Sequence, residues 1–312
     1  MIDQVVARVR ENIQKVIVGK DDVINLVLVA VLCEGHLLIE DVPGTGKTTL
    51  AKSVAISLGC SFRRIQFTPD LLPSDVTGIN FFNQKSQEFE FRPGPVLSQI
   101  VLADEINRAT PRTQSALLEA MQERQITADG ETRPLPRPFL IMATQNPVEL
   151  EGTFPLPEAQ LDRFLLRVNI GYPSEEGENT ILLRFRLDDP LDTLGAVTGP
   201  AEISTLISAV REIPVEESVQ NYVVKIARQT RDHAEIALGA SPRATMALYR
   251  TAQAWAAIHG SRFVTPDHIK FIAPYVLTHR IMVSPQMRLR GRTPEEALAD
   301  IVDAVPVPVS AA

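Results

Sequence analysis

The sequence contains few residues of the kinds that form disulfides or zinc sites: two cysteines and five histidines among 312 residues. Cys33 and Cys60 do not have the spacing of a metal-binding motif, and we expect them to be small core residues of a reduced, intracellular protein. The histidines are dispersed, and no H-E-x-x-H motif occurs. The sequence therefore gives no sign of a zinc site.

Long hydrophobic runs are also absent. The longest run, residues 26–33, has eight residues and is too short to span a bilayer. Residues 1–14 (MIDQVVARVRENIQ) are amphipathic, whereas a signal peptide has a charged segment followed by an apolar core. We therefore expect a soluble, cytoplasmic protein that does not insert into membranes.

Basic residues are outnumbered by acidic ones. The chain has 31 Lys and Arg against 38 Asp and Glu, a net charge of −7 and a pI near 5.4. A general nucleic-acid binder would need surplus Lys and Arg to contact phosphates. The composition argues against that class, although it is compatible with a local basic groove. With 45% apolar residues, the chain is long enough for two domains and a sizeable core.

Short apolar strands alternate with helices over the first part of the chain. Residues 1–35 have a helical pattern with a break at residues 16–20. We expect strands at 36–40, 62–67, 99–105 and 138–146, helices at 47–59 and 111–124, and a helix at 160–172 that leads into a fifth strand. This alternation predicts a largely parallel sheet covered on both faces.

The pattern changes after residues 171–178, where strand-like segments become scarce. A loop is expected at residues 188–200. The expected helices of this part are 203–210, 219–234, 244–258 and 266–273. We therefore predict an α/β core over residues 1–172 and a helical second domain over residues 173–312.

A phosphate-binding loop is predicted between the first strand and its helix. The segment DVPGTGKT (41–48) matches the end of the pattern G-x-x-x-x-G-K-[ST]. Gly44 and Gly46 let the backbone curl so that N–H groups face inward, and the helix start adds its positive dipole end. Lys47 would reach the β- and γ-phosphates, and the Thr48 hydroxyl would ligate Mg²⁺. The alternative is a chance turn between a strand and a helix.

Two adjacent acids end the buried strand segment IVLADE (100–105). In open parallel sheets, ligands bind at the carboxyl ends of the strands. Asp104 would hold Mg²⁺ through water, and Glu105 would orient and deprotonate the attacking water. Taken alone, the pair could equally be two solvated acids. Its position some fifty residues after the Lys47-Thr48 loop favours the catalytic interpretation.

Two longer segments, ADEINRATPRTQSALLEAMQER (103–124) and MATQNPVELEGTFPLPEAQLDRFLL (142–166), resemble the MoxR family of AAA+ ATPases. The resemblance covers most of residues 15–172 and is looser over residues 173–312. It implies an α/β fold, with an AAA+ core of mostly parallel sheet flanked by helices and a C-terminal all-α lid. It also implies a ring homo-oligomer, commonly a hexamer, that binds ATP and Mg²⁺. Such ATPases use hydrolysis to remodel, assemble or activate client proteins, often with a von Willebrand factor A domain partner.

The resemblance assigns roles to three further polar residues. Asn146 resembles sensor 1, which positions the attacking water; the alternative is an asparagine that opens the turn after a strand. Arg163 resembles an arginine finger that reaches a neighbouring subunit's nucleotide, the alternative being an ion pair with Asp162 or Glu158. Arg243 resembles sensor 2 in the lid, aimed at the γ-phosphate; a solvated helix start is its alternative.

The local sequence pattern and the family resemblance together suggest which residues contact the adenine base and which residue caps the helix of Arg243. Val18 and Gly19 resemble the adenine contact, although a simple helix break would also explain them. Ser241 is a predicted N-cap of the helix that presents Arg243. The expected ATP-binding residues are Val18, Gly19, Pro43, Gly44, Thr45, Gly46, Lys47, Thr48 and Thr49. Gln66 could act as a polar switch toward Glu105.

Asp41 occupies the place of the first glycine of the phosphate-loop pattern. The segment EDVPG resembles a recurring start of this loop in MoxR-type proteins. Aspartate also tolerates left-handed turn conformations better than most residues. We expect its carboxylate to point away from the phosphates, toward backbone N–H groups or a basic neighbour. The Asp41→Gly variant should then bind ATP normally and lose at most some stability.

Residues 80–91 and 125–135 are predicted β-hairpins, the second with an Asp129-Gly130 turn. They match insertions that lie near the ring pore in related ATPases, but plain surface ribbons are an equal alternative. A competing function is a nucleic-acid motor or loader, which would share the same ATP site. A monomeric small-molecule kinase would not explain the helical lid with Arg243. The identity of the client cannot be read from the sequence.

Overall fold

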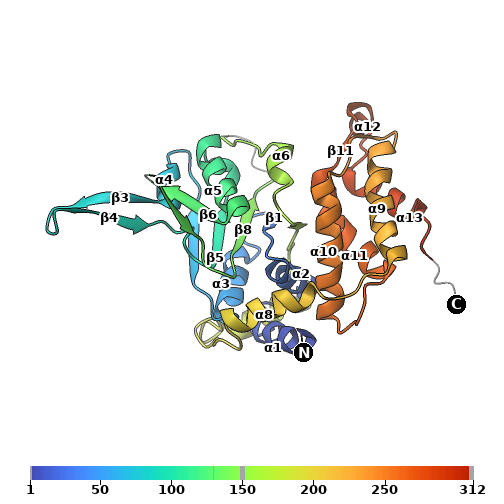
Figure 1. Cartoon of the computed structure of the whole chain (residues 1–312). Coiled ribbons are helices and arrows are strands. Elements are labelled where there is room, and N and C mark those ends of the chain that lie inside the picture. The colour runs from blue at the N-terminus through green and yellow to red at the C-terminus, as the bar shows by residue number, and fades with distance from the viewer. Residues whose placement is uncertain (1, 129, 148–151, 309–312) are drawn as a thin grey trace.

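A five-stranded parallel sheet forms the centre of the core (Figure 1). A computed structural model describes residues 2–128, 130–147 and 152–308. The strands, in spatial order, are β2 (Phe62–Gln66), β5 (Ile100–Asp104), β8 (Leu140–Gln145), β1 (Leu37–Glu40) and β9 (Leu166–Val168). All five residues of the inner strand β5 are buried, because the sheet is covered on both faces as its apolar strands predict.

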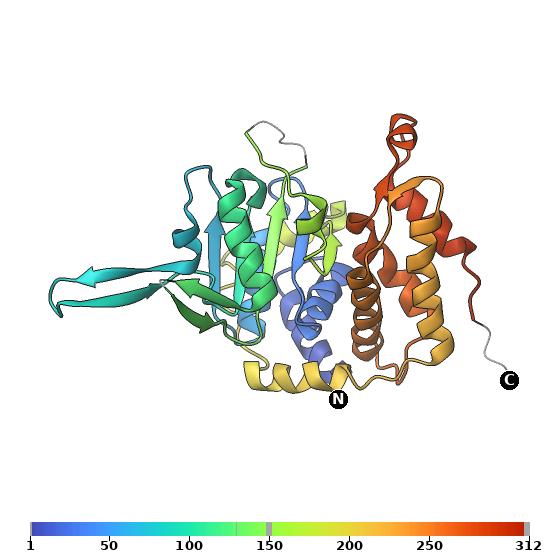
Figure 2. The same cartoon turned by 45° about the horizontal axis from the view of Figure 1, so that its top comes forward.

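Successive strand residues face two different hydrophobic clusters. Leu37 and Ile39 pack into one cluster, whereas Leu38 between them packs into the other. Three helices, α1 (Ile2–Gln14), α2 (Asp21–Leu32) and α3 (Lys47–Ser57), contribute to the first cluster, and α5 (Pro111–Glu123) contributes to the second. Figure 2 shows the sheet between these layers. The predicted α/β fold class is confirmed.

The helix predicted at residues 160–172 is wrong. The structure has a four-residue helix, α6 (Glu158–Leu161), and then enters β9. Leu166 and Val168 are buried, and Arg167 between them is less so, which is the alternation of a strand. Parallel pairing of β9 with β1 satisfies the backbone there and prevails over the helical pattern of the local sequence.

Both predicted hairpins are present. One pairs β3 (Gly78–Asn83) with β4 (Glu88–Pro93), after the short helix α4 (Pro73–Thr77). The other pairs β6 (Gln125–Ala128) with β7 (Glu131–Pro134); Asp129 of its predicted turn lies outside the described residues. Figure 1 shows β3 and β4 projecting far from the body. This projecting hairpin exposes three aromatic side chains, Phe81, Phe82 and Phe89.

The second half of the chain is mostly helical, as expected. Its helices are α7 (Glu175–Arg184), α8 (Pro200–Val210), α9 (Glu217–Asp232), α10 (Pro242–Ile258), α11 (Pro266–Leu277), α12 (Pro285–Leu289) and α13 (Pro294–Ala304). The sequence did not predict the small antiparallel sheet of β10 (Ile236–Leu238) and β11 (Met282–Val283). Helix α8 packs against α1 and α2 of the core as well as against α10 of the lid. The division at residue 172 stays a prediction.

Arg280 joins the lid to the core. Its guanidinium is buried and donates to the Asp162 carboxylate at 2.9 Å. It also donates to main-chain oxygens of Phe164 at 2.5 Å, Leu165 at 3.2 Å and Val276 at 2.6 Å. Burial lowers the pKa of Arg280 to about 10, while Asp162 opposes that shift, so the group stays charged at neutral pH. These bonds fix how the lid segment after α11 meets the end of the core.

Two other sequence expectations concern cysteines and membranes. Both cysteines are unpaired and only partly exposed, and burial raises the pKa of Cys33 to about 12 and that of Cys60 to about 11. They therefore behave as packing residues. Within the described ranges, every helix is too short or too polar to cross a membrane.

A buried histidine makes the fold sensitive to acid. His36 accepts from the Ile141 N–H at its Nδ1, so its Nε2 carries the proton that it shares with the Met121 carbonyl. Burial lowers the pKa of His36 to about 4. The neutral ring is therefore required in the folded state. Protonation favours the unfolded chain as the pH falls below the ordinary histidine pKa.

We expect acidification from pH 7 to pH 5 to lower the free energy of unfolding by about 2 kcal/mol through His36 alone. The unfolded histidine takes up a proton in this range, whereas the folded one stays neutral. Urea denaturation at both pH values measures the difference. The His36→Gln variant should lose less stability on the same acidification, and an unchanged loss would contradict the assignment.

Candidate active site

The loop between β1 and α3 has the geometry of an anion-binding nest. Gly44 and Gly46 adopt positive φ angles of 86° and 85°, and no atom lies within 4 Å of where a Cβ would stand at either position. The backbone N–H groups of residues 44–48 donate to no other described residue. All of these residues except Thr45 line a cavity of about 420 Å³, together with the polar ends of β5 and β8. Such a set of N–H groups at a helix start suits a phosphate.

Lys47 and Thr48 open the helix α3 and both line this cavity. The Lys47 ammonium donates to the main-chain oxygens of Asp41 at 2.9 Å and Val42 at 2.7 Å. It is therefore folded back onto its own loop. The Thr48 hydroxyl has no hydrogen bond to the described residues, which leaves it able to bind a cation.

Asp104, the last residue of β5, and Glu105 after it also line the cavity, and Thr144 of β8 holds both of them. Its hydroxyl donates to Asp104 at 2.6 Å and accepts from the Glu105 N–H at 2.8 Å. Glu105 adopts a left-handed backbone conformation with φ 57°. This conformation is uncommon for a residue with a side chain and is often found at functional sites. Asn146 lines the same cavity.

The acids also contact the edge strand β2. Arg64 pairs with Asp104, and Gln66 donates to Glu105 at 2.8 Å, as the sequence suggested for Gln66. Arg108 forms an ion pair with Glu105 at 3.0 Å. Both carboxylates are thus restrained by neighbouring side chains.

The donor set fits Mg²⁺. Asp104 and Thr48 line one cavity, and hard oxygen ligands of this kind suit the ion. The described residues contain no group of three or more His, Cys, Asp or Glu that could hold a metal by themselves. Magnesium at this place would therefore take its other ligands from phosphates and water, as it usually does in phosphate-binding proteins.

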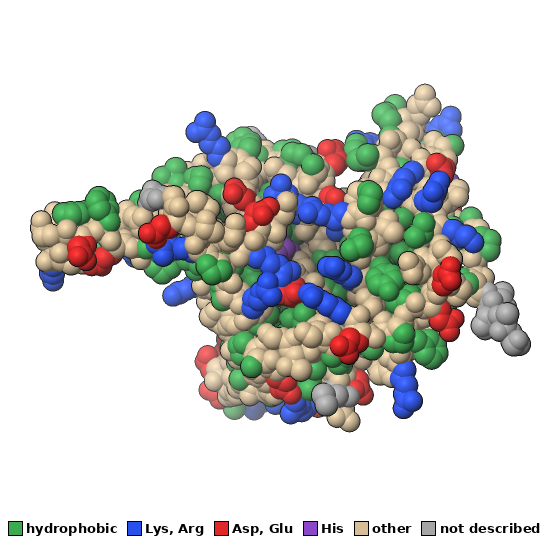
Figure 3. Space-filling model, viewed as in Figure 1, with side chains coloured by type: hydrophobic (Ala, Val, Ile, Leu, Met, Phe, Trp, Pro, Cys, Tyr) green, Lys and Arg blue, Asp and Glu red, His purple; other side chains and the backbone are tan. Residues whose placement is uncertain are grey.

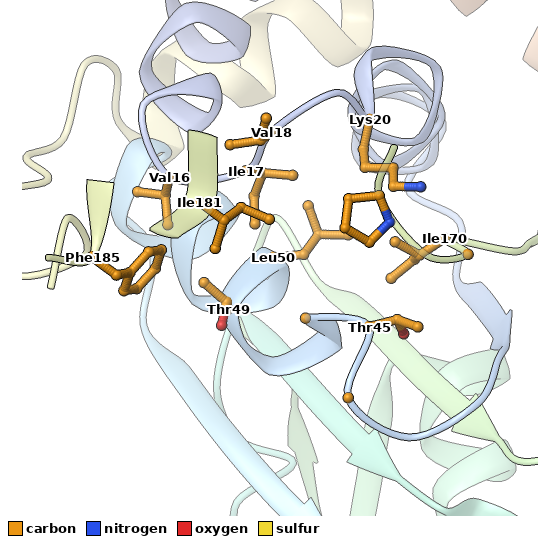
Figure 4. Close-up of a pocket in the computed structure, with 14 residues that line it drawn as sticks. Val16, Ile17, Val18, Lys20, Thr45, Thr49, Leu50, Ile170, Ile181 and Phe185 are labelled. Atoms are coloured by element: carbon orange, nitrogen blue, oxygen red, sulfur yellow. The ribbon is translucent and has the colours of Figure 1, made fainter. Parts of the chain in front are cut away.

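An apolar pocket of about 200 Å³ adjoins the phosphate cavity and shares Gly44, Gly46 and Thr49 with it. Figure 4 shows the side chains that surround it. Its apolar lining consists of Val16, Ile17, Val18, Leu50, Ile170, Pro173, Ile181 and Phe185. A flat apolar space next to a phosphate nest matches the two ends of a nucleotide.

The predicted base-contact residues occupy different places in this arrangement. Val18 and Thr45 line the apolar pocket, and Pro43 lines the phosphate cavity. Gly19 does not line either space; its φ of 66° turns the chain between α1 and α2. Lys20 lines the pocket at its polar end and donates to the Tyr172 carbonyl at 2.8 Å.

Asp41 turns its carboxylate toward backbone N–H groups, as expected. It accepts from Val42 at 2.8 Å, Ile170 at 3.0 Å and Gly171 at 2.7 Å. The side chain is buried and does not line the phosphate cavity. The residue that breaks the glycine pattern therefore ties the loop to the segment after β9.

Arg163 and Arg243 lie together in a third cavity, of about 470 Å³, between core and lid. That cavity shares no lining residue with the phosphate cavity. Asp162, the expected partner of Arg163, is engaged by Arg280 and by the Ser241 hydroxyl. Within the described residues, Arg163 and Arg243 form no ion pair. Figure 3 shows Lys and Arg side chains gathered over the junction of core and lid.

The local structure around Arg243 follows the sequence. The Ser241 hydroxyl accepts from the Ala244 N–H at 3.1 Å and caps α10, which starts at Pro242. Two turns later on the same helix, Arg250 lines the same cavity. Sequence reasoning missed Arg250, Arg64 and Thr144 as members of these cavities. The only signal in the sequence was spacing: Arg250 follows Arg243 by two helical turns, and Arg64 and Thr144 each precede a predicted site residue, Gln66 and Asn146, by two positions.

Comparisons with known proteins agree with this geometry. The sequence profile of the ATPase family associated with various cellular activities (AAA) matches residues 36–166, and that of the AAA lid domain matches residues 228–301. The chain is 39% identical to "Chaperone MoxR1" of Mycobacterium tuberculosis, over 95% of this chain and 81% of that protein. It is 31% identical to "Protein MoxR" of Methylorubrum extorquens, over 97% and 95% of the two chains. The chain belongs to the MoxR family of AAA+ ATPases.

Other relatives extend over the same length of this MoxR-family chain. It is 50% identical to "Uncharacterized protein YeaC" of Bacillus subtilis, over 96% of this chain and 93% of that protein. A crystal structure from Cytophaga hutchinsonii superposes with a TM-score of 0.93 at 36% identity, covering 99% of this chain and 96% of that one. The core and helical lid therefore form an AAA+ fold.

We expect Asp41→Gly in this MoxR-family protein to cost about 1–3 kcal/mol of unfolding free energy, because buried N–H groups lose a charged acceptor. Chemical denaturation measures this cost. Nucleotide affinity of the folded variant should remain close to that of the wild type, since the carboxylate does not face the phosphate cavity. A large loss of affinity without a loss of stability would contradict this role.

Proposed function

We propose that this MoxR-family protein hydrolyses Mg²⁺-ATP as a ring of identical subunits, a hexamer by its family resemblance, and remodels, assembles or activates partner proteins. The observation that carries this proposal is the separation of two cavities. One contains the phosphate nest and the acids, and the other contains two arginines, Arg163 and Arg243, that have no carboxylate partner among the described residues. An active site would be complete only when the arginines of one subunit reach the nucleotide bound to its neighbour.

Within one subunit, the residues have complementary roles. The base would lie in the apolar pocket, and the phosphates would accept from the N–H groups of residues 44–48. Lys47 would exchange two main-chain oxygens for phosphate oxygens. Bound Mg²⁺, held by Thr48 and Asp104, would neutralise part of the phosphate charge. Glu105 would take the proton of the attacking water, and Asn146 would orient that water.

The arginines would act between subunits. Arg163 and Arg243 have no carboxylate partner among the described residues, and neither lines the phosphate cavity of its own chain. A guanidinium stabilises the charge that spreads over a transferring phosphoryl group. We therefore assign both to the neighbour's γ-phosphate. For Arg243, this replaces the expectation that a lid arginine reaches the phosphate in its own subunit.

A protein client fits the surface better than nucleic acid does. The net charge is −7, whereas nucleic-acid binding favours a basic surface. The projecting hairpin of β3 and β4 exposes Phe82 and Phe89, whose rings contact each other edge to face. Exposed aromatic side chains of this kind suit an apolar protein segment. A von Willebrand factor A domain protein is the partner class that the family resemblance favours.

Two substitutions test the chemistry within a subunit. Lys47→Ala should abolish nucleotide binding, whereas Glu105→Gln should bind ATP and lose about 10²–10⁴-fold in turnover. Binding is measured with a fluorescent nucleotide and turnover by phosphate release. Lys52→Ala, an exposed position on the same helix α3, is the matched control and should behave as the wild type. Retained turnover in Glu105→Gln would exclude Glu105 as the base.

Mixing variants tests the assignment between subunits. Arg163→Ala and Lys47→Ala assemblies should each be inactive, because each lacks one half of every active site. Mixed assemblies should regain part of the activity, since some interfaces combine an intact nucleotide site with an intact arginine. Arg243→Ala should be rescued by Lys47→Ala in the same way. Absence of any rescue, with mixed assembly verified by native mass spectrometry, would argue against action in trans.

A further inference from the structure

The edge strand β2 restrains both acids of the active site. Arg64 donates to the Oδ2 atom of Asp104 from Nη2 at 2.5 Å and from Nε at 3.1 Å. The other carboxylate oxygen, Oδ1, accepts from the Thr144 hydroxyl at 2.6 Å. Each oxygen of the proposed metal-facing acid thus already has a donor. A cation that approaches Asp104 must compete with the Arg64 guanidinium for Oδ2.

The same guanidinium is connected to the second acid. Arg64 Nη2 also donates to Gln66 Oε1 at 2.6 Å, and Gln66 Nε2 donates to Glu105 Oε2 at 2.8 Å. The hydrogen bonds therefore run from Asp104 through Arg64 and Gln66 to Glu105. Because Arg64 and Gln66 are two residues apart on one strand, their side chains lie on the same face. Moving Arg64 removes the bond that orients the Gln66 amide.

The ion pair between Arg64 and Asp104 is weak enough to break reversibly. The Arg64 side chain is 47% exposed, whereas that of Asp104 is 12% exposed. Partly exposed ion pairs shift an equilibrium by about 1.5- to fivefold. A cation that binds the Asp104 carboxylate can therefore displace the Arg64 guanidinium at a small cost in free energy. A divalent cation carries twice the charge of the guanidinium and binds carboxylate oxygen directly or through water.

We propose that Arg64 is a positioning residue that covers Asp104 in the resting chain and, when it leaves, frees Gln66 and Glu105 for catalysis. Metal binding at Asp104 and release of the catalytic base Glu105 would then be coupled through the side chains of β2. The proposal rests on the function proposed above, because it takes Asp104 and Glu105 as the metal-facing acid and the base. It adds a residue that neither the phosphate-loop pattern nor the family resemblance assigned.

The direct test is how strongly Mg²⁺ promotes nucleotide binding. Affinity for a fluorescent ADP is measured in excess Mg²⁺ and in EDTA, and the ratio of the two is compared between variants. In Arg64→Ala this ratio should rise about 1.5- to fivefold. Without the Arg64 guanidinium, the Asp104 carboxylate is no longer neutralised. It then repels metal-free ADP and binds the cation without competition. Arg64→Lys, which can form a single contact, should give an intermediate ratio.

Arg63→Ala is the matched control. Arg63 is the preceding residue of β2, is exposed, and has no ion pair within the described residues. Its ratio should equal that of the wild type. Thermal unfolding of all variants verifies that the fold is intact. If Arg64 simply binds phosphate, both affinities should fall together in Arg64→Ala and the ratio should stay constant, which would overturn the proposal.

A double-mutant cycle tests the connection to Glu105. If Arg64 acts through Gln66, then Arg64→Ala should change the turnover number much less in a Gln66→Ala background than in the wild type. If the two substitutions change the turnover number independently, so that their effects multiply, Arg64 does not act through Gln66.

The binding experiment also separates this inference from the proposed function. If the wild-type protein fails to bind ADP with or without Mg²⁺, the nucleotide site itself is wrong and both proposals fall. If the wild type binds ADP and responds to Mg²⁺ as Arg64→Ala does, only the role of Arg64 is overturned.

Discussion

The Asp41 carboxylate connects the two segments that enclose the nucleotide site. It accepts from the N–H of Val42 at the start of the phosphate loop and from those of Ile170 and Gly171 after β9. Ile170 and Gly171 form a wall of the apolar pocket. A charged acceptor makes stronger hydrogen bonds than a neutral one, so a single buried side chain fixes the distance between the base and phosphate subsites. Glycine at this position could not make these bonds.

A second buried charge fixes where the lid arginine Arg243 lies. Arg280 binds Asp162 and the adjacent backbone, and Asp162 in turn accepts from the Ser241 cap of α10. Arg243 follows that cap, so it lies beside Arg163 in the cavity between core and lid. Because the guanidinium of Arg280 has several partners, shifting the lid would leave a buried charge unsatisfied. The arginines are thus held together in a cavity that shares no lining residue with the phosphate cavity of the same chain.

The sequence predicts elements whose determinants are contiguous and fails where they are distant. Residues of β1, the phosphate loop and α3 form one local pattern, and the structure has the strand, the turn and the helix where the pattern places them. By contrast, β9 has three residues, and its strand conformation depends on pairing with β1, more than a hundred positions earlier. Alternation in β2 indicates that Arg64 and Gln66 share a face, but their meeting with Asp104 and Glu105 depends on the parallel pairing of β2 with β5.

The phosphate cavity satisfies its own charges before any ligand binds. Its two cationic side chains, Lys47 and Arg64, lie against oxygens of the chain, and its two acids, Asp104 and Glu105, accept from protein donors. Nucleotide binding therefore exchanges contacts within the protein for contacts to phosphate, and the affinity reflects the difference between them. The four side chains sum to zero charge, whereas a triphosphate with one Mg²⁺ remains negative. The loop N–H groups and the start of α3 stabilise part of this negative charge, and in the proposed ring Arg163 and Arg243 of a neighbouring subunit would add positive charge.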